Sequence, residues 1–265
     1  MMKHGVVFVT ILVLGLALLP SDGIGGSEES SKIWIDKTDE YVEILKSAEV
    51  VDLKDVGSGV TRPWKATLKA GDRTIYGAYK PIKRGRQSGA WESYEAEIAA
   101  YELDRMLGLG MVPPTVEREI RSKKGSLQLW INDCELFKDV KGRPTRAYEW
   151  TKELARMMMF DALIYNPDRN AGNFLVSPHW EVILIDHSQA FLARKNLPKD
   201  EKKIPMRFDR KVVESLRGLQ VDELHSRLEG VLLKDQIEAL LARRDALLTH
   251  IDKLILERGE DVVLF

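Results

Sequence analysis

The apolar residues of this chain follow two different patterns, and the change between them near residues 132–142 constrains the possible folds most. Before this point, short apolar runs separated by Gly-containing turns are typical of β-strands. They are Val50–Val56, Trp64–Leu68, Thr74–Tyr79, Thr115–Ile120 and Ser126–Ile131, with one amphipathic helix expected over Trp91–Leu107. After it the spacing is helical, with helices expected at Glu149–Ile164, Arg207–Leu216, Val221–Leu228 and Lys234–Glu257. The sequence therefore predicts an α+β fold of two lobes, β-rich over residues 33–132 and α-rich over residues 133–265.

Composition narrows the class of protein. The chain has 265 residues, 44% of them hydrophobic, which excludes a wholly disordered chain. Its 40 Lys and Arg residues against 41 Asp and Glu give a net charge of −1, and this balance argues against a nucleic-acid partner. The single cysteine, Cys134, cannot form an intrachain disulfide or a cysteine-based zinc site, and we expect it to be buried bulk.

The amino terminus has the features of a secretory signal. Lys3 and His4 precede an apolar run from Gly5 to Leu19, and Pro20 with small residues follows. We therefore expect residues 1–25 to direct the protein into the secretory pathway or, in a bacterium, out of the cytoplasm. A membrane anchor and a buried N-terminal helix are the alternatives, and membrane contact is expected only through this segment if it stays uncleaved.

The densest chemical signal lies between residues 166 and 191. Asp168 is followed five residues later by Asn173, and Asp186 ends an apolar strand expected at Val182–Ile185. Phosphoryl transfer needs such a set: one aspartate orients the attacking hydroxyl, while an asparagine and a second aspartate hold Mg²⁺ or Mn²⁺ on the phosphates. The alternative is a plain turn, in which Asn, Asp, Pro and Gly are common.

A second group of candidate residues lies upstream. Lys80 ends the third expected strand, and Glu97 lies on the following helix, in the order that a phosphate-contacting lysine and its carboxylate partner require. Gly57, Ser58 and Gly59 lie between the first two strands and are candidates to cover phosphates with backbone N–H groups, although a hairpin turn explains them as well. The connection near Trp130 and Ile131 is expected to meet adenine through its backbone.

Several segments resemble known kinases. Residues Ala96–Arg118 are similar to the secretory-pathway kinases, the Golgi casein kinase and xylosylkinase family with bacterial relatives. Tyr79–Pro81 and Asp168–Val176 also resemble type II phosphatidylinositol 4-kinases and HipA-like kinases. The resemblance implies a protein-kinase-like fold in which Lys80 and Glu97 pair, Asp168 is catalytic and Asp186 is the principal metal ligand.

The sequence also departs from the kinase pattern. Asn166-Pro167 replaces the usual His-Arg before the catalytic aspartate, and Asp186-His187-Ser188 replaces Asp-Phe-Gly. Asn173 fits the general kinase and lipid-kinase pattern better than that of the secretory kinases. Because of these differences, the sequence does not identify the class of molecule that accepts the phosphoryl group.

The function we expect is transfer of the γ-phosphoryl group of ATP, with Mg²⁺ or Mn²⁺, to a hydroxyl acceptor on a protein, glycan or lipid. A pseudokinase that binds or senses nucleotide without turnover is the alternative. The basic loop Lys83–Arg86 is expected to be solvated, or else to contact phosphates or an acidic acceptor.

Overall fold

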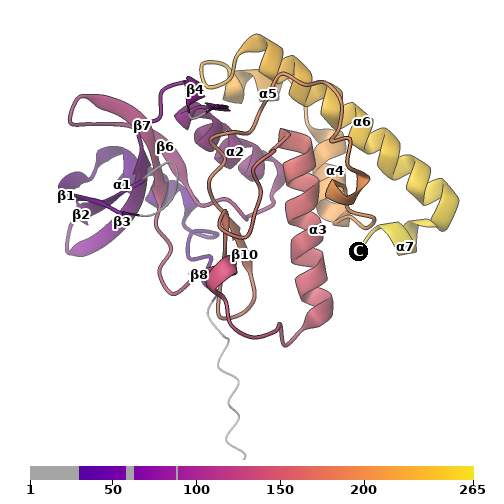
Figure 1. Cartoon of the computed structure of the whole chain (residues 1–265), viewed down its shortest axis with the longest axis horizontal. Helices are drawn as coiled ribbons and strands as arrows, with labels where there is room; N and C mark the ends of the chain where they lie inside the picture. The colour runs from indigo at the N-terminus through magenta and orange to yellow at the C-terminus, as the bar shows by residue number, and fades with distance from the viewer. Residues whose placement is uncertain (1–29, 58–62, 88) are drawn as a thin grey trace, which may run out of the picture.

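The computed structural model describes residues 30–57, 63–87 and 89–265. It has a β-rich N-terminal lobe and a helical C-terminal lobe (Figure 1), so the predicted α+β fold class is confirmed. The predicted signal, residues 1–25, and two predicted phosphate-loop residues, Ser58 and Gly59, lie outside the described residues. Among the helices that are described, none is both long and apolar enough to cross a membrane.

A five-stranded antiparallel sheet forms the N-terminal lobe, in the order β1-β2-β3-β7-β6. Its strands are β1 (Glu49–Asp55), β2 (Trp64–Ala70), β3 (Arg73–Lys80), β6 (Thr115–Ile120) and β7 (Lys123–Leu129). The hairpin of β4 (Gly85–Gln87) and β5 (Ala90–Glu92) leads from β3 into helix α2 (Tyr94–Leu107), and helix α1 (Thr38–Ser47) precedes the sheet.

The two faces of this sheet have different surroundings. Neighbouring side chains on a strand point to opposite faces, so Tyr79 and Lys80, at the end of β3, are separated by the sheet. Tyr79 is 1% exposed and packs in the apolar cluster that includes α1. Arg118 holds α1 against this face, because its guanidinium donates to the Leu45 and Ala48 carbonyls at 2.7 and 2.6 Å. Lys80 is left facing α2.

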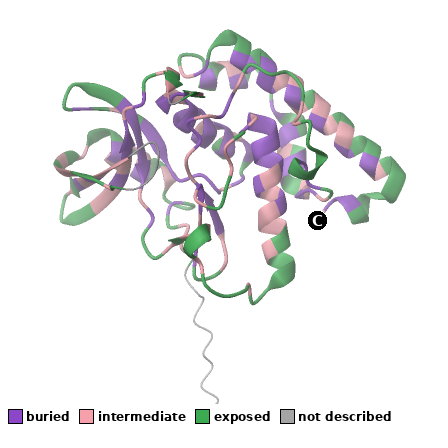
Figure 2. Cartoon of the chain, viewed as in Figure 1, coloured by how far each residue is buried: buried purple, intermediate pink, exposed green. Residues whose placement is uncertain are grey.

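The C-terminal lobe is built from helices around a small sheet of order β10-β9-β8. Its helices are α3 (Ala147–Ile164), α4 (Arg210–Gly218), α5 (Val221–Leu228), α6 (Lys234–Arg258) and α7 (Glu260–Val263), and its strands are β8 (Glu135–Leu136), β9 (Phe174–Val176) and β10 (Val182–Leu184). Buried residues gather where α3, α4 and α6 meet (Figure 2).

One buried arginine joins α6 to the end of α3. Arg243 is 0% exposed, and it donates to the Leu163 carbonyl at 2.7 Å and to the Leu192 carbonyl at 3.1 Å. Burial lowers the pKa of Arg243 to about 10. The hydrogen bond from Arg243 to Leu163 therefore fixes the end of α3, after which the loop of residues 166–173 follows.

The start of α2 differs from its prediction. The helix expected over Trp91–Leu107 begins at Tyr94, because residues Ala90–Glu92 pair with β4 instead. Ser93 caps the helix, and its hydroxyl accepts the Glu95 N–H at 3.1 Å. This hairpin turns residue 92 toward the C-terminal lobe, as described below.

A buried carboxylate holds the loop after α2. The Asp104 oxygens accept the N–H groups of Gly110, Met111 and Val112 at 3.1, 2.9 and 3.1 Å. The Met111 carbonyl in turn accepts the Leu184 N–H at 2.8 Å, so Asp104 fixes the loop against which β10 lies. Burial raises the pKa of Asp104 to about 7, even with three donors present.

Asp104→Asn should flatten the pH dependence of stability between about pH 4 and pH 7. Folded Asp104 keeps its proton up to about pH 7, whereas the ordinary value is 3.8. The folded chain therefore binds more protons in this window, and its free energy of unfolding falls as the pH rises, by an amount on the order of a few kcal/mol. Urea unfolding of both proteins across the window checks this, and parallel curves would contradict it.

Candidate active site

The loop from Asn166 to Asn173 carries the predicted catalytic aspartate. Helix α3 ends at Ile164, and the next residue, Tyr165, has a left-handed backbone. The Asn166 side chain accepts the Asp168 N–H at 3.1 Å. The Asn173 amide donates to the Asp168 carbonyl and to its carboxylate, both at 2.9 Å. The structure thus brings Asp168 and Asn173 together and leaves the Asn173 side-chain oxygen available as a ligand.

Arg169, which the sequence analysis did not single out, ties this loop to its surroundings. Its guanidinium makes two hydrogen bonds to the Asp161 carboxylate, at 2.9 and 3.0 Å. It also donates to the Asn173 carbonyl, and to the Ile185 carbonyl at 2.9 Å. One side chain therefore places Asn173 beside the residue that precedes Asp186. An Arg next to Asp168 was visible in the sequence, but its partners, 4 to 16 residues away, follow no helical or strand spacing that would identify them.

Asp186 follows β10 with a φ of 59°. A left-handed backbone is unfavourable for a residue other than glycine and concentrates at functional sites. This conformation turns the carboxylate back toward the N-terminal lobe, where its Oδ1 lies 2.9 Å from Lys80 Nζ.

Lys80 bridges Glu97 and Asp186. Its Nζ lies 2.7 Å from Glu97 Oε1, and the two side chains are 9% and 2% exposed. Burial alone would lower the pKa of Lys80, but the Asp186 and Glu97 carboxylates reverse this and raise it above its ordinary value. Burial would likewise raise the pKa of Glu97, yet the Lys80 ammonium outweighs it and the net shift is well downward. Lys80 and Glu97 are therefore held in their charged forms.

Glu97 also contacts the C-terminal lobe directly. Its second oxygen accepts the His187 backbone N–H at 2.9 Å. The His187 ring is fully buried where other kinases have Phe, and neither ring nitrogen has a hydrogen-bond partner among the described residues. Burial lowers the pKa of His187, so a neutral ring fills this space at neutral pH, with its Nδ1 3.5 Å from the Glu97 carboxylate.

A further carboxylate, Glu92, lies near Asp186 and was not predicted from the sequence. Glu92 is 5% exposed, and Gln189 Nε2 donates to it at 3.3 Å. Next to it, the Ser93 N–H donates to the Ser188 carbonyl at 2.9 Å. Burial, followed by the nearby Asp186 carboxylate, raises the pKa of Glu92. The sequence offered three glutamates at positions 92, 95 and 97, and no local signal distinguished the first.

The residues predicted to contact the nucleotide, Trp130, Ile131 and Gly57, have contacts within the protein. The Trp130 N–H donates to the Tyr76 carbonyl at 2.9 Å, and the Lys65 ammonium lies 4.4 Å from both ring centroids. Ile131 is 6% exposed and packs in the N-terminal core, so its side chain is not available to a base. Gly57, the part of the predicted phosphate loop that is described, uses its N–H to bind Asp55 at 2.8 Å.

The donor set fits a magnesium-type ion held jointly with phosphates. The described residues contain no cluster of three or more His, Cys, Asp or Glu arranged for a metal. Mg²⁺ is commonly held by one or two protein oxygens together with substrate phosphates and waters. The Asp186 carboxylate and the Asn173 amide oxygen provide such a pair.

Solved structures of the same fold are kinases. The chain matches hydra Fam20, solved with sugar, with a TM-score of 0.64 and 16% identity over 86% of this chain and 93% of that one. It matches the Golgi casein kinase with Mn/ADP bound with a TM-score of 0.61 and 17% identity, over 85% and 78% of the two chains. The fold is therefore protein-kinase-like.

Sequence comparison identifies the family. The profile of the phosphatidylinositol 3- and 4-kinase family matches residues 59–251, and the chain belongs to this family. The Mycobacterium tuberculosis protein Rv2133c is 26% identical over 187 residues, which cover 57% of this chain and 66% of that protein. Phosphatidylinositol 4-kinase gamma 4 of rice is 33% identical over 125 residues, 40% of this chain but only 21% of the rice protein. The predicted resemblance to secretory-pathway and phosphatidylinositol kinases is confirmed.

Lys80 and Glu97 should behave as one unit in unfolding experiments. A double-mutant cycle of Lys80→Met and Glu97→Gln, followed by urea unfolding, should give a coupling energy of about 1–3 kcal/mol. Glu95→Gln is the matched control, since Glu95 pairs instead with Arg84 at 3.6 Å, and its coupling to Lys80→Met should be near zero. Equal coupling for both glutamates would contradict this arrangement.

Proposed function

We propose that this protein is an ATP-dependent phosphotransferase that moves the γ-phosphoryl group to a hydroxyl acceptor with Mg²⁺ or Mn²⁺. The observation that carries the proposal is the Lys80 ammonium, held between Glu97 and Asp186 at 2.7 and 2.9 Å. This bridge places a permanent cation beside the carboxylate that is best positioned to bind metal. Its family and the Mn/ADP-bound Golgi casein kinase of similar fold support the same proposal.

Each residue has a distinct part in the proposed reaction. Asp186 and Asn173 would hold the metal, which neutralises charge on the transferred phosphoryl group. Lys80 contacts the phosphates and is kept in place by Glu97. Asp168 accepts a hydrogen bond from the acceptor hydroxyl, aims its oxygen at the phosphorus and takes its proton late in the transfer. Because Asn173 donates to Asp168, the metal site and the acceptor site share one loop.

The acceptor class and the compartment are part of the proposal. A hydroxyl on a lipid, glycan or protein suits Asp168 equally, so a panel of these acceptors with labelled ATP is the direct test. The predicted signal at residues 1–25 stays a prediction and would place the enzyme in the secretory pathway or outside a bacterial cytoplasm, where a source of ATP is required.

Asp186→Ala should remove metal-dependent nucleotide binding. This substitution deletes the carboxylate that approaches the phosphates from the end of β10, and we expect the thermal stabilisation by ATP with Mg²⁺ or Mn²⁺ to disappear and phosphotransfer to be abolished. Titration of ATP in a thermal-shift assay, with and without each metal, measures it. Unchanged metal-dependent stabilisation would exclude Asp186 as the ligand.

Asp168→Asn should separate binding from turnover. The nearly isosteric amide keeps the loop shape but cannot take the acceptor proton, so ATP affinity should stay within a few-fold while phosphotransfer falls by about 10²–10⁴-fold. Autophosphorylation provides the assay if no acceptor is found, and circular dichroism checks the fold. Equal rates in both proteins would mean that Asp168 is not the catalytic residue. Binding without turnover in the wild type would favour the pseudokinase.

A further inference from the structure

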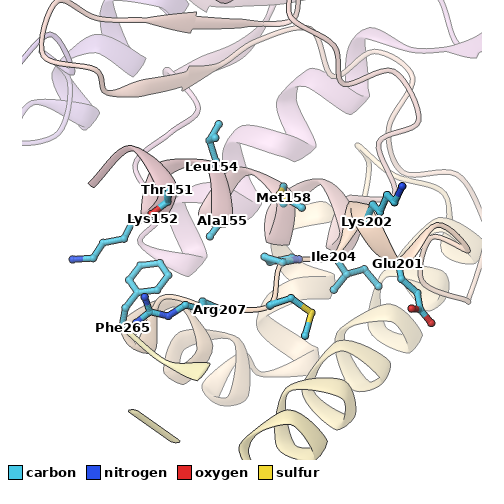
Figure 3. A pocket seen from close by; sticks show the side chains of 12 residues that line it. Thr151, Lys152, Leu154, Ala155, Met158, Glu201, Lys202, Ile204, Arg207 and Phe265 are labelled. Atoms are coloured by element: carbon cyan, nitrogen blue, oxygen red, sulfur yellow. The ribbon is translucent and has the colours of Figure 1, made fainter. Parts of the chain in front are cut away.

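A groove away from the catalytic loop opens on the C-terminal lobe (Figure 3). It has a volume of about 620 Å³, within the range of ligand sites. Its walls are the first half of α3, the segment 201–207 and the C-terminal Phe265. Its apolar lining includes Leu154, Ala155, Met158, Ile204, Met206 and Phe265. The α3 residues that line it end at Met158, well over one helical turn before the loop that carries Asp168.

Basic residues are frequent in the two chain segments that form most of this groove. Residues 138–158 contain six Lys and Arg against three Asp and Glu, and residues 194–207 contain six against two, in a chain whose net charge is −1. Lys152, Lys202 and Arg207 belong to the lining itself. Several other cations of these two segments form no ion pair with any residue that the structure describes: Lys141, Arg143, Arg146, Lys199 and Lys203. The face therefore carries an excess of positive charge, although Glu201 also lines the groove and Lys152 pairs with Glu149 at 3.2 Å.

Exposed apolar side chains extend the groove onto the surface. Met206 is 46% exposed, Tyr148 52% and Val262 56%. Arg207 holds Tyr148 and Val262 close to Met206, its neighbour in the chain. Its guanidinium donates to the Val262 carbonyl at 3.0 Å and to the Tyr148 hydroxyl at 3.2 Å. Apolar and basic groups therefore share one face, and such a combination marks an interaction site.

We propose that this face binds the surface of a bilayer that contains anionic phospholipids. In this arrangement the groove receives the apolar part of a lipid, and the surrounding cations contact the phosphate groups. Tyr148 suits the boundary between water and lipid, where Tyr is enriched. This site is separate from the proposed catalytic residues and does not depend on which acceptor the enzyme uses.

The lining favours a lipid over a peptide. No residue that lines the groove belongs to a β-strand, so there is no strand edge with which an extended peptide could pair. The α3 wall has its backbone groups bonded within the helix, and an acyl chain needs no hydrogen bonds. An acidic amphipathic peptide is the competing occupant, and the experiment below distinguishes the two.

The test is sedimentation of the full chain with vesicles of phosphatidylcholine, with and without phosphatidylserine. We expect preferential binding to the anionic vesicles that weakens as salt rises. The triple variant Lys199→Glu, Lys202→Glu and Lys203→Glu should lower that partitioning by about a hundredfold, from about fivefold per basic residue. Met206→Asp should lower it too, because it places a carboxylate where the apolar part of a lipid would lie. These positions are exposed, so the variants should fold, and circular dichroism verifies this.

A charge-matched control isolates the face. Lys37→Glu, Lys46→Glu and Lys69→Glu reverse three exposed lysines of the N-terminal lobe, and this variant should bind anionic vesicles within a few-fold of the wild type. The N-terminal apolar segment is the same in every protein compared, so it cannot produce the difference. Equal loss in both triple variants, or no loss in either, would overturn the proposal. Binding of an acidic amphipathic peptide that is lost in Met206→Asp, with no vesicle binding by the wild type, would overturn it in favour of a peptide site.

Discussion

The Lys80 ammonium, enclosed by the Glu97 and Asp186 carboxylates, is the interaction on which the arrangement of the two lobes depends. Removing these charges from water is costly, and mutual attraction offsets the cost only when the geometry is close to ideal. Three separate elements must therefore be in register at once: β3 supplies the cation, α2 one carboxylate and the loop after β10 the other. The hydrogen bond from the His187 backbone N–H to Glu97 also joins α2 to the loop after β10. The site is thus assembled by the contact that joins the lobes.

The parts of this site that depend on order along the chain could be predicted from the sequence. A strand that ends in Lys80, a helix that carries Glu97 and a loop with Asp168 five residues before Asn173 are local patterns, and the structure brings these residues together. The strand and helix spacing that predicted the α+β fold is also local, since side chains repeat every two residues in a strand and every 3.6 in a helix. Local patterns do not predict where an element begins or ends. Helix α2 begins only at Tyr94, because Ala90–Glu92 pair with the neighbouring strand.

The parts that could not be predicted are buried polar residues whose partners are distant in sequence. Arg243 binds carbonyls 80 and 51 residues away, and Glu92 binds Gln189 at a separation of 97. In the sequence each resembles an ordinary surface charge, because Arg and Glu are mostly exposed. Asp104 is similar in kind: its partners are only six to eight residues away, but its burial is set by the packing of α2 against the C-terminal lobe. Tertiary burial, which a single sequence does not express, gives these residues their roles.

The charges of the candidate active site connect this architecture to the proposed use of metal. Its acidic side chains outnumber its basic ones, the acidic residues being Glu92, Glu97, Asp168 and Asp186. Lys80 balances one of them, and Arg169 is committed to Asp161. A nucleoside triphosphate adds further negative charge, and at short range its repulsion from these carboxylates amounts to several kcal/mol in a partly desolvated site. A divalent cation that arrives with the phosphates turns this repulsion into attraction, so the proposed need for Mg²⁺ or Mn²⁺ follows from the charge of the protein itself, independently of its relatives.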